Sequence, residues 1–222
     1  MIRVYYTDTK PLENPETFER IFEALPGYRR EKIEKLKLGR DRNLSAAAGF
    51  LLMRAAEDAG LDACEKIETN VYGKPFFAGR PDIDFSLSHS GEMALCAIAD
   101  VPVGCDIEKT GRNRMAVAER FFTPEEKEIL KSVKDADLRN EEFYRLWTLK
   151  ESFIKCRGLG ISLALDSFSV TADDNGFCAR MNGILQNNIF VERKYADGYS
   201  AALCMETSDP EYKNPDEYRM VI

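Results

Sequence analysis

The chain has little of several features that mark specialised classes of protein. It contains no run of eighteen apolar residues, which predicts that no segment spans a membrane. It has one histidine and six cysteines without a CxxC pair, so we expect buried free thiols in a reducing compartment and no zinc site. Its formal net charge of −7 disfavours non-specific nucleic-acid binding. We therefore expect a cytoplasmic protein that binds neither nucleic acid nor membrane.

The most informative stretch is Val-Gly-Cys-Asp-Ile-Glu at residues 103–108. Apolar residues alternate with the others, which predicts a strand with one buried face. Asp106 and Glu108 would project from the same side, roughly 6.5–7 Å apart at their Cα atoms. Two carboxylates at this spacing favour a cation between them, and their hard oxygens suit Mg²⁺ or Ca²⁺. Taken alone, the pattern is also typical of an exposed strand with two solvated acids.

A second informative stretch, W-x-x-K-E-S-x-x-K, covers residues 147–155. Apolar residues recur there at helical spacing, which predicts an amphipathic helix. Trp147, Glu151 and Lys155 follow one another at i,i+4 intervals and would line one edge of this helix. Taken alone, the Glu151–Lys155 pair is also typical of a solvated helix surface.

In combination these motifs resemble the 4′-phosphopantetheinyl transferases, in particular the larger monomeric class typified by the surfactin-synthetase activator of bacilli. G-x-D-I-E precedes W-x-x-K-E-S-x-x-K by some forty residues. Phe85–Gly91 matches the F-x-x-S-H-S-G segment of that class, and Tyr72–Pro75 matches its G-K-P turn. Arg120–Phe122 and Gly158–Leu163 extend the likeness, which runs from about residue 28 to about residue 170 in the order of the family.

The resemblance implies an α+β fold, a pseudo-dimer of two similar α/β halves with the active site in the cleft between them. A weak internal echo between Gly91–Cys96 and Gly198–Cys204 agrees with this. We place the boundary near Asp100–Pro102. The N-terminal half, residues 1–101, would then bind the coenzyme A phosphates, and the C-terminal half, residues 102–222, would hold the metal and dock the carrier. Two halves within one chain imply a monomer.

The implied activity is transfer of the 4′-phosphopantetheine arm from coenzyme A to a serine of an apo acyl or peptidyl carrier protein, which releases adenosine 3′,5′-bisphosphate. The resemblance implies Mg²⁺ at Asp106, Glu108 and Glu151, and this ion commonly takes few carboxylates together with phosphate oxygens and water. Glu151 would accept the serine proton, directly or through a metal-bound water. Lys155 would place a positive charge on the transferred phosphate.

A polyanionic donor requires local positive charge in this acidic chain, and residues 28–37 are rich in lysine and arginine. For each of these cations taken alone, a solvated surface position is the alternative. Lys150 could reach the phosphates or be solvated, and the sequence does not decide between these. The resemblance implies the following residues at the donor: Arg29, Lys32, Arg42, Asn43, Lys74, Ser88, His89 and Lys155.

Two other functions stay open from the residues alone: a Mg²⁺-dependent pyrophosphate or nucleotide hydrolase, and a catalytically silent coenzyme A-binding module. The presence of all three carboxylates argues against the silent module. A carrier would dock on an apolar rim near Gly158–Leu165, where Leu159, Ile161 and Leu163 are either contacts or interior packing. Residues 206–222 are polar and predict a lightly packed tail.

Overall fold

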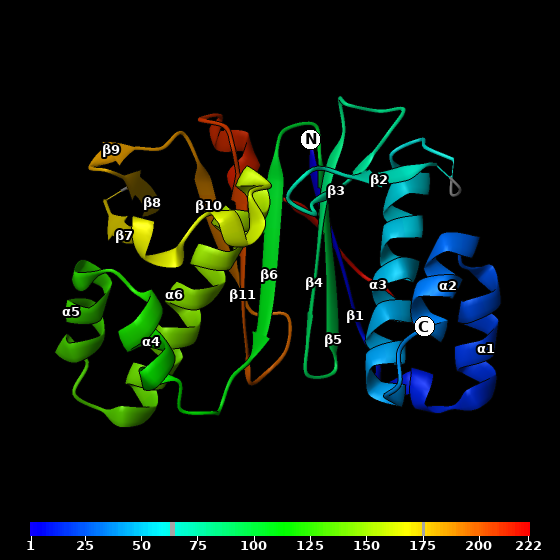
Figure 1. Ribbon diagram of the computed structural model, residues 1–222, viewed down its shortest axis with the longest axis horizontal. Helices are drawn as coiled ribbons and strands as arrows, with labels where there is room; N and C mark the ends of the chain where they lie inside the picture. Colours follow the sequence, from blue (N-terminus) through cyan, green and yellow to red (C-terminus); the bar gives the residue numbers. More distant parts are fainter. Residues whose placement is uncertain (63–64, 175) are drawn as a thin grey trace.

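The computed structural model describes residues 1–62, 65–174 and 176–222. Cys64, one of the cysteines expected to be buried, lies outside these residues. In Figure 1 the long strands of the two main sheets stand in the centre of the molecule, with one group of helices on each outer side and a small sheet within residues 168–185 at the left edge. The first group belongs to the N-terminal half, whose elements are β1 (Ile2–Asp8), α1 (Pro15–Ala24), α2 (Gly27–Glu34), α3 (Gly39–Asp58), β2 (Ile67–Thr69), β3 (Pro75–Phe77), β4 (Asp84–Ser90) and β5 (Met93–Ala99).

The second half repeats this order of elements. It starts with a strand, continues with two short helices and one long helix, and ends with a pair of long antiparallel strands. These elements are β6 (Val103–Lys109), α4 (Met115–Phe121), α5 (Pro124–Ser132), α6 (Ala136–Arg157), β7 (Phe168–Asp173), β8 (Gly176–Met181), β9 (Ile184–Leu185), β10 (Ile189–Arg193) and β11 (Tyr199–Met205).

The two central sheets also share one topology. In the first half β5 lies between β1 and β4, and in the second half β11 lies between β6 and β10. All four of these pairs are antiparallel. The prediction of an α+β fold with two similar halves is therefore confirmed.

The two long helices owe their limits and their packing to local sequence. Helix α6 begins after Asp135, whose side chain accepts the backbone N–H groups of Asp137 and Leu138, and ends at Gly158 in the left-handed conformation. Such caps satisfy the free backbone groups of a helix end. Helix α3 begins at Gly39 and presents a buried face of small residues to the first sheet.

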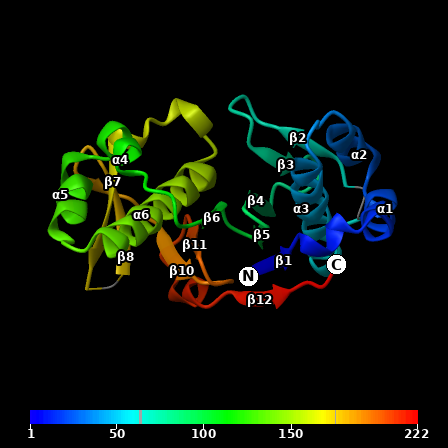
Figure 2. The same ribbon diagram turned by 90° about the horizontal axis from the view of Figure 1, so that it is seen from below.

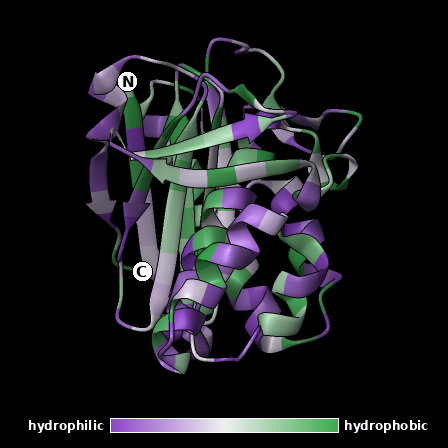
Figure 3. Cartoon of the chain, turned by 90° about the vertical axis from the view of Figure 1, so that its left-hand side faces the viewer, coloured by the Kyte–Doolittle hydropathy of each residue, from purple (hydrophilic) through white to green (hydrophobic). Residues whose placement is uncertain are grey.

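The helices on the outside are amphipathic. Figure 3 shows hydrophobic and hydrophilic residues on each of the helices that face the viewer. None of the helices in the described part of the chain combines the length and the hydropathy that crossing a membrane would require.

The end of the described chain is lightly packed in its side chains, as we predicted, but its backbone is paired with a strand. Strand β12 (Asp216–Arg219) pairs in parallel with β1, and Met220 donates its backbone N–H to the carbonyl of Tyr6. Figure 2 shows this strand along the lower edge of the view, where it runs from the second half to the first. The polar composition of the segment concealed its pairing, because an edge strand keeps solvated side chains. The division after residue 101 stays a prediction, and β12 crosses it.

Candidate active site

The two halves meet where β4 lies beside β6, although these strands belong to different sheets. Side chains of β4, in place of its backbone, accept the backbone N–H groups of β6. We name this contact the side-chain seam. Its bonds are 2.8 to 3.2 Å long and join Asp84 to Val103, Ser86 to Cys105, Ser88 to Ile107 and Ser90 to Lys109.

The glycine of the G-x-D-I-E motif sets the distance between α6 and β6. A Cβ atom on Gly104 would lie 1.9 Å from the carbonyl oxygen of Ser152 and 2.4 Å from the nitrogen of Cys156. Both are backbone atoms of α6, so only glycine permits this approach. The close packing brings Glu151 and Lys155 of the helix next to the two acids of the strand.

The acids of β6 are held by specific partners. Asp106 is buried, and its Oδ1 accepts hydrogen bonds from the Ser88 hydroxyl at 2.8 Å and the Lys155 ammonium at 2.6 Å. Its Oδ2 is also buried but has no hydrogen-bond partner among the described residues. Glu108 accepts a hydrogen bond from the Ser90 hydroxyl at 2.8 Å. A buried carboxylate oxygen without a partner is costly unless a cation or a donor reaches it.

The electrostatics of the site favour an added positive charge. Burial, followed by the negative charge of Asp106, raises the pKa of Glu108 and likewise that of Glu151. Burial would lower the pKa of Lys155, but Asp106 and its neighbours outweigh that effect and raise it. One ammonium group therefore faces three carboxylates in a partly buried place, where burial and then repulsion among the acids raise the pKa values of Glu108 and Glu151.

The chemistry of Asp106, Glu108 and Glu151 suits the binding of a divalent cation. They offer hard oxygen ligands, an excess of negative charge and the unpartnered Oδ2 of Asp106. As arranged here, the His, Cys, Asp and Glu side chains of the described residues form no group of three that could hold a metal. The Lys155 ammonium instead contacts Asp106. The assignment of Mg²⁺ to Asp106, Glu108 and Glu151 stays a prediction.

A cavity of about 860 Å³ opens beside the seam, and its walls differ in charge. Asp106, Glu108, Glu151 and Lys155 line one wall, which the second half provides. The first half provides the other wall, to which Arg29, Lys32, Ser88 and His89 contribute. The structure thus brings together eight of the predicted site residues.

The wall from the first half is suited to an anion. Arg29 is only 7% exposed, and its Nε has no hydrogen-bond partner within the described chain. Burial, and then the charge of Arg29, lowers the pKa of Lys32. Burial within the hollow and then the positive charges of Lys155, Lys32 and Arg29 lower the pKa of His89. Uncompensated positive charge of this kind would be relieved by bound phosphate.

Three predicted donor contacts lie elsewhere. The ammonium group of Lys74 donates to the carboxylate of Asp84 and to the carbonyls of Val103 and Cys156, so its three N–H groups are engaged. The Arg42 guanidinium lies 5.0 Å from the centre of the Phe18 ring and does not line the cavity. Asn43 lines a neighbouring cavity of about 820 Å³, which touches the site only through Glu108.

Lys150 is neither solvated nor directed at the cavity, so both expectations for it were wrong. Its side chain is 0% exposed. The ammonium group donates to both carboxylate oxygens of Glu126, at 2.6 and 2.8 Å, and to the carbonyl of Phe168. Burial lowers its pKa, against the opposing effect of Glu126. The pair joins α6 to α5 and β7.

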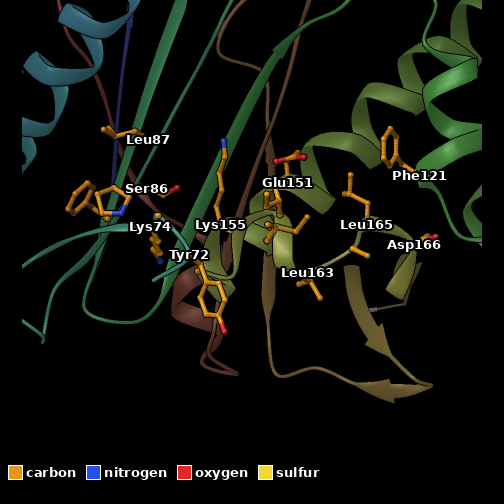
Figure 4. A pocket seen from close by; sticks show the side chains of 18 of the residues that line it. Tyr72, Lys74, Ser86, Leu87, Phe121, Glu151, Lys155, Leu163, Leu165 and Asp166 are labelled. Atoms are coloured by element: carbon orange, nitrogen blue, oxygen red, sulfur yellow. The ribbon is translucent and has the colours of Figure 1, made fainter. Parts of the chain in front are cut away.

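A second cavity of about 650 Å³ adjoins the first, and Glu151 and Lys155 line both. Figure 4 shows these two side chains on α6, with Tyr72 to one side and Phe121 to the other. Most of the remaining lining is apolar. Of the residues proposed for carrier docking, Ile161 is 103% exposed at this cavity, whereas Leu163 is a buried part of its wall. Leu159 is partly buried and packs against the core.

Sequence reasoning assigned no role to Ser90 or Trp147, which contact or line the site. A signal for Ser90 was present, because Ser86, Ser88 and Ser90 follow one another at the period of a strand and share one face. The sequence does not show which strand this face packs against. Only the packing of β4 on β6 reveals it.

Comparison with known proteins identifies the family of the chain. The family model of the 4′-phosphopantetheinyl transferase superfamily matches residues 102–204. A Bacillus subtilis 4′-phosphopantetheinyl transferase is 40% identical over 169 residues, which are 75% of each chain. The 4′-phosphopantetheinyl transferase Sfp of Bacillus subtilis strain 168 is 34% identical over 216 residues, 96% of this chain and 93% of the relative. A solved holo-(acyl-carrier-protein) synthase from Bacillus anthracis has a TM-score of 0.39 at 22% identity, over 49% of this chain and 97% of its own. The chain belongs to the 4′-phosphopantetheinyl transferase superfamily.

Proposed function

We propose that this protein transfers the 4′-phosphopantetheine arm of coenzyme A to a serine hydroxyl of an apo acyl or peptidyl carrier protein, with release of adenosine 3′,5′-bisphosphate. The observation that carries this proposal is the cavity with a cationic wall opposite a carboxylate wall, in a member of this superfamily. A pyrophosphate diester needs both, since its phosphates must be bound and the charge of the reaction must be stabilised.

In this reaction the serine Oγ forms a bond to the phosphorus that bears pantetheine, and the bond from that phosphorus to the bridging oxygen breaks. Arg29 and Lys32 hold the donor phosphates in place, which is the main requirement for phosphoryl transfer. Lys155 supplies positive charge near the transferred group. Glu151, which lines both cavities, accepts the proton of the serine directly or through a water.

The carboxylates of Asp106, Glu108 and Glu151 would hold Mg²⁺. When bound, this ion neutralises charge on the phosphate oxygens. The free Oδ2 of Asp106 and the raised pKa values of Glu108 and Glu151 support this assignment. In the protein without metal, Lys155 compensates part of the same negative charge.

The carrier would dock at the mouth of the apolar cavity, next to Glu151 and Lys155. Exposed apolar side chains lie at this mouth: Tyr72 in the turn between β2 and β3, and Ile161 after α6. Because one chain provides both charged walls, we propose that the monomer is active. The five described cysteines are free thiols, which suits a cytoplasmic location.

Intact-mass spectrometry tests the proposal. An apo acyl carrier and an apo peptidyl carrier are each incubated with coenzyme A, Mg²⁺ and the protein, with and without a chelator. We expect a mass gain of one phosphopantetheine arm, lost with the chelator and in Glu151→Ala. Glu128→Ala is the matched control, because Glu128 is an exposed acid on α5 that lines neither cavity, and this variant should retain the activity. Cleavage of coenzyme A without a mass gain on either carrier would replace the transferase by a hydrolase.

A further inference from the structure

The serines of β4 are not equivalent, although all three accept a backbone N–H from β6. Ser88 also donates its own hydroxyl hydrogen to Oδ1 of Asp106, and Ser90 donates to Oε2 of Glu108, each at 2.8 Å. Ser86 accepts the backbone N–H of Cys105, and among the described residues its hydroxyl bonds to no acid. Two serines therefore couple the seam to the acids, and the third serves the seam alone.

A hydroxyl bonded in this way has a fixed orientation. Its oxygen is held by a backbone N–H of β6, so its hydrogen is aimed at the carboxylate next to it. Each serine engages one oxygen of its acid. For Asp106 the consequence is visible, since Oδ1 is engaged and Oδ2 is left as the buried oxygen without a partner.

Ser88 has no capacity left for a donor phosphate in this arrangement. Its oxygen accepts the N–H of Ile107 and a hydrogen of the Lys155 ammonium, at 3.2 and 3.1 Å, while its hydrogen goes to Asp106. A hydroxyl has one hydrogen and two lone pairs, so all three are used. This differs from the phosphate contact that the family resemblance implies for Ser88.

We propose that Ser88 and Ser90 are positioning residues of the metal site, which orient Asp106 and Glu108 from the opposite half of the molecule. The inference rests on the Mg²⁺ site proposed above. Partners that orient metal ligands typically change metal affinity by about 10–100-fold when they are removed. Ser90 is the better residue to test, because Ser88 also contacts Lys155.

The test measures Mn²⁺ binding to the full chain by electron paramagnetic resonance, with the metal alone as the probe. We expect Ser90→Ala to raise the Mn²⁺ dissociation constant by about 10–100-fold. Ser90→Thr keeps the hydroxyl and should restore most of the affinity. Ser86→Ala is the matched control, because it removes the same kind of bond to β6 but no bond to an acid, and it should leave the dissociation constant unchanged.

A kinetic readout separates positioning from a general loss of structure. The Mg²⁺ concentration for half-maximal transfer should rise in Ser90→Ala, while the KM for coenzyme A at saturating Mg²⁺ stays unchanged. Equal Mn²⁺ affinity in Ser90→Ala and the wild type would overturn the inference. So would an equal weakening in Ser90→Ala and Ser86→Ala, since that would reduce the seam to a structural contact.

Failure of the proposed function gives a different result. If the wild type binds no Mn²⁺ and transfers the arm equally well in chelator, the metal site itself is refuted together with this inference. If the wild type binds Mn²⁺ and loses activity in chelator, but Ser90→Ala has the same Mn²⁺ dissociation constant as the wild type, only the positioning role is refuted. Thermal unfolding of each variant establishes that it is folded at the temperature of the measurement.

Discussion

The two halves have the same order of elements, but the first strand of each half has a different second neighbour. Both β1 and β6 pair on one side with the central strand of their sheet. On its other side β1 pairs with the backbone of β12, whereas β6 faces the side chains of β4. The backbone pairing closes a sheet. The side-chain pairing interposes hydroxyl groups between two sheets, and the acids of the site are located there.

The halves differ in charge as well as in pairing. The first half brings Arg29, Lys32 and His89 to the cavity, and the second brings three carboxylates and Lys155. A symmetrical arrangement of elements thus supports an asymmetrical site. Neither half alone contains both the binding and the reacting groups, so the contact between them is as important as either fold. The following predictions test this difference, starting with the largest expected effect.

The contact of α6 with β6 is the place where the second half should be most sensitive. Gly104→Ala places a Cβ atom 1.9 Å from the backbone oxygen of Ser152, which a rotamer change cannot relieve. We expect a loss of more than about 3 kcal/mol in the free energy of unfolding, or no folded protein. Urea unfolding measures it. Gly39→Ala at the start of α3 has no atom within 4 Å and should be tolerated. A wild-type midpoint for Gly104→Ala would contradict the prediction.

The buried pair of the second half gives the next largest effect. Lys150→Met leaves Glu126 buried without its cation and should cost about 3–5 kcal/mol. Adding Glu126→Gln removes the stranded charge but keeps an acceptor for the backbone of Val170, so we expect it to recover part of the loss. Chemical unfolding of both variants measures the recovery.

Kinetics then separates this structural role of Lys150 from a role in donor binding. The KM for coenzyme A should remain at its wild-type value in Lys150→Met at any temperature where that variant is folded. A KM that rises without a loss of stability would show instead that Lys150 acts on the donor.

The cationic wall of the first half should contribute binding and little stability. Arg29→Gln removes a buried charge that has no acid partner among the described ion pairs, and should weaken coenzyme A binding by about 10–100-fold, as expected for a charged hydrogen bond of roughly 1.5–3 kcal/mol. Calorimetry at several salt concentrations measures the affinity and its dependence on salt. We expect both to be lower in Arg29→Gln than in the wild type. Arg30→Gln, at the exposed neighbour on α2, is the control. Equal affinities of the two variants would disprove the assignment.

The smallest effect concerns the repulsion between acids in the second half. The pKa of Glu108 is raised on folding, so its contribution to stability is fully present below the ordinary carboxyl pKa and is lost as the pH rises through the raised value. In chelator we expect Glu108→Gln to melt about 1–3 °C above the wild type near neutral pH and to lose this advantage in acid. Scanning calorimetry measures it. Glu128→Gln should show no such gain, and added Mg²⁺ should stabilise the wild type and Glu128→Gln but not Glu108→Gln.

Much of the fold was predictable because it depends on local patterns. The alternation of residues 103–108 and the helical spacing around Trp147 identified β6 and α6, and the family resemblance identified two halves. The pairing of β12 was not predictable in this way. It depends on an edge of β1 that lies more than two hundred residues away in the chain.

The site was predictable in its residue types but not in all its contacts. Sequence reasoning grouped eight residues that the cavity brings together. It did not identify the acids that engage Lys74 and Lys150, which are Asp84 and Glu126, because a lysine in a sequence carries no sign of its partner. The expectations for Lys150 were wrong, and the donor contact of Lys74 stays a prediction.

The pairing of β12 with β1 also fixes an order of assembly during translation. Strands β1, β5 and β4 can form as soon as residue 99 has left the ribosome, but β12 begins only at residue 216. Through the synthesis of the whole second half, the nascent chain therefore presents an edge strand with unpaired backbone groups, which can join strands of other chains. Strand β1 thus waits for its second neighbour longer than β4 or β5 waits for a partner, so aggregation during synthesis should begin at β1.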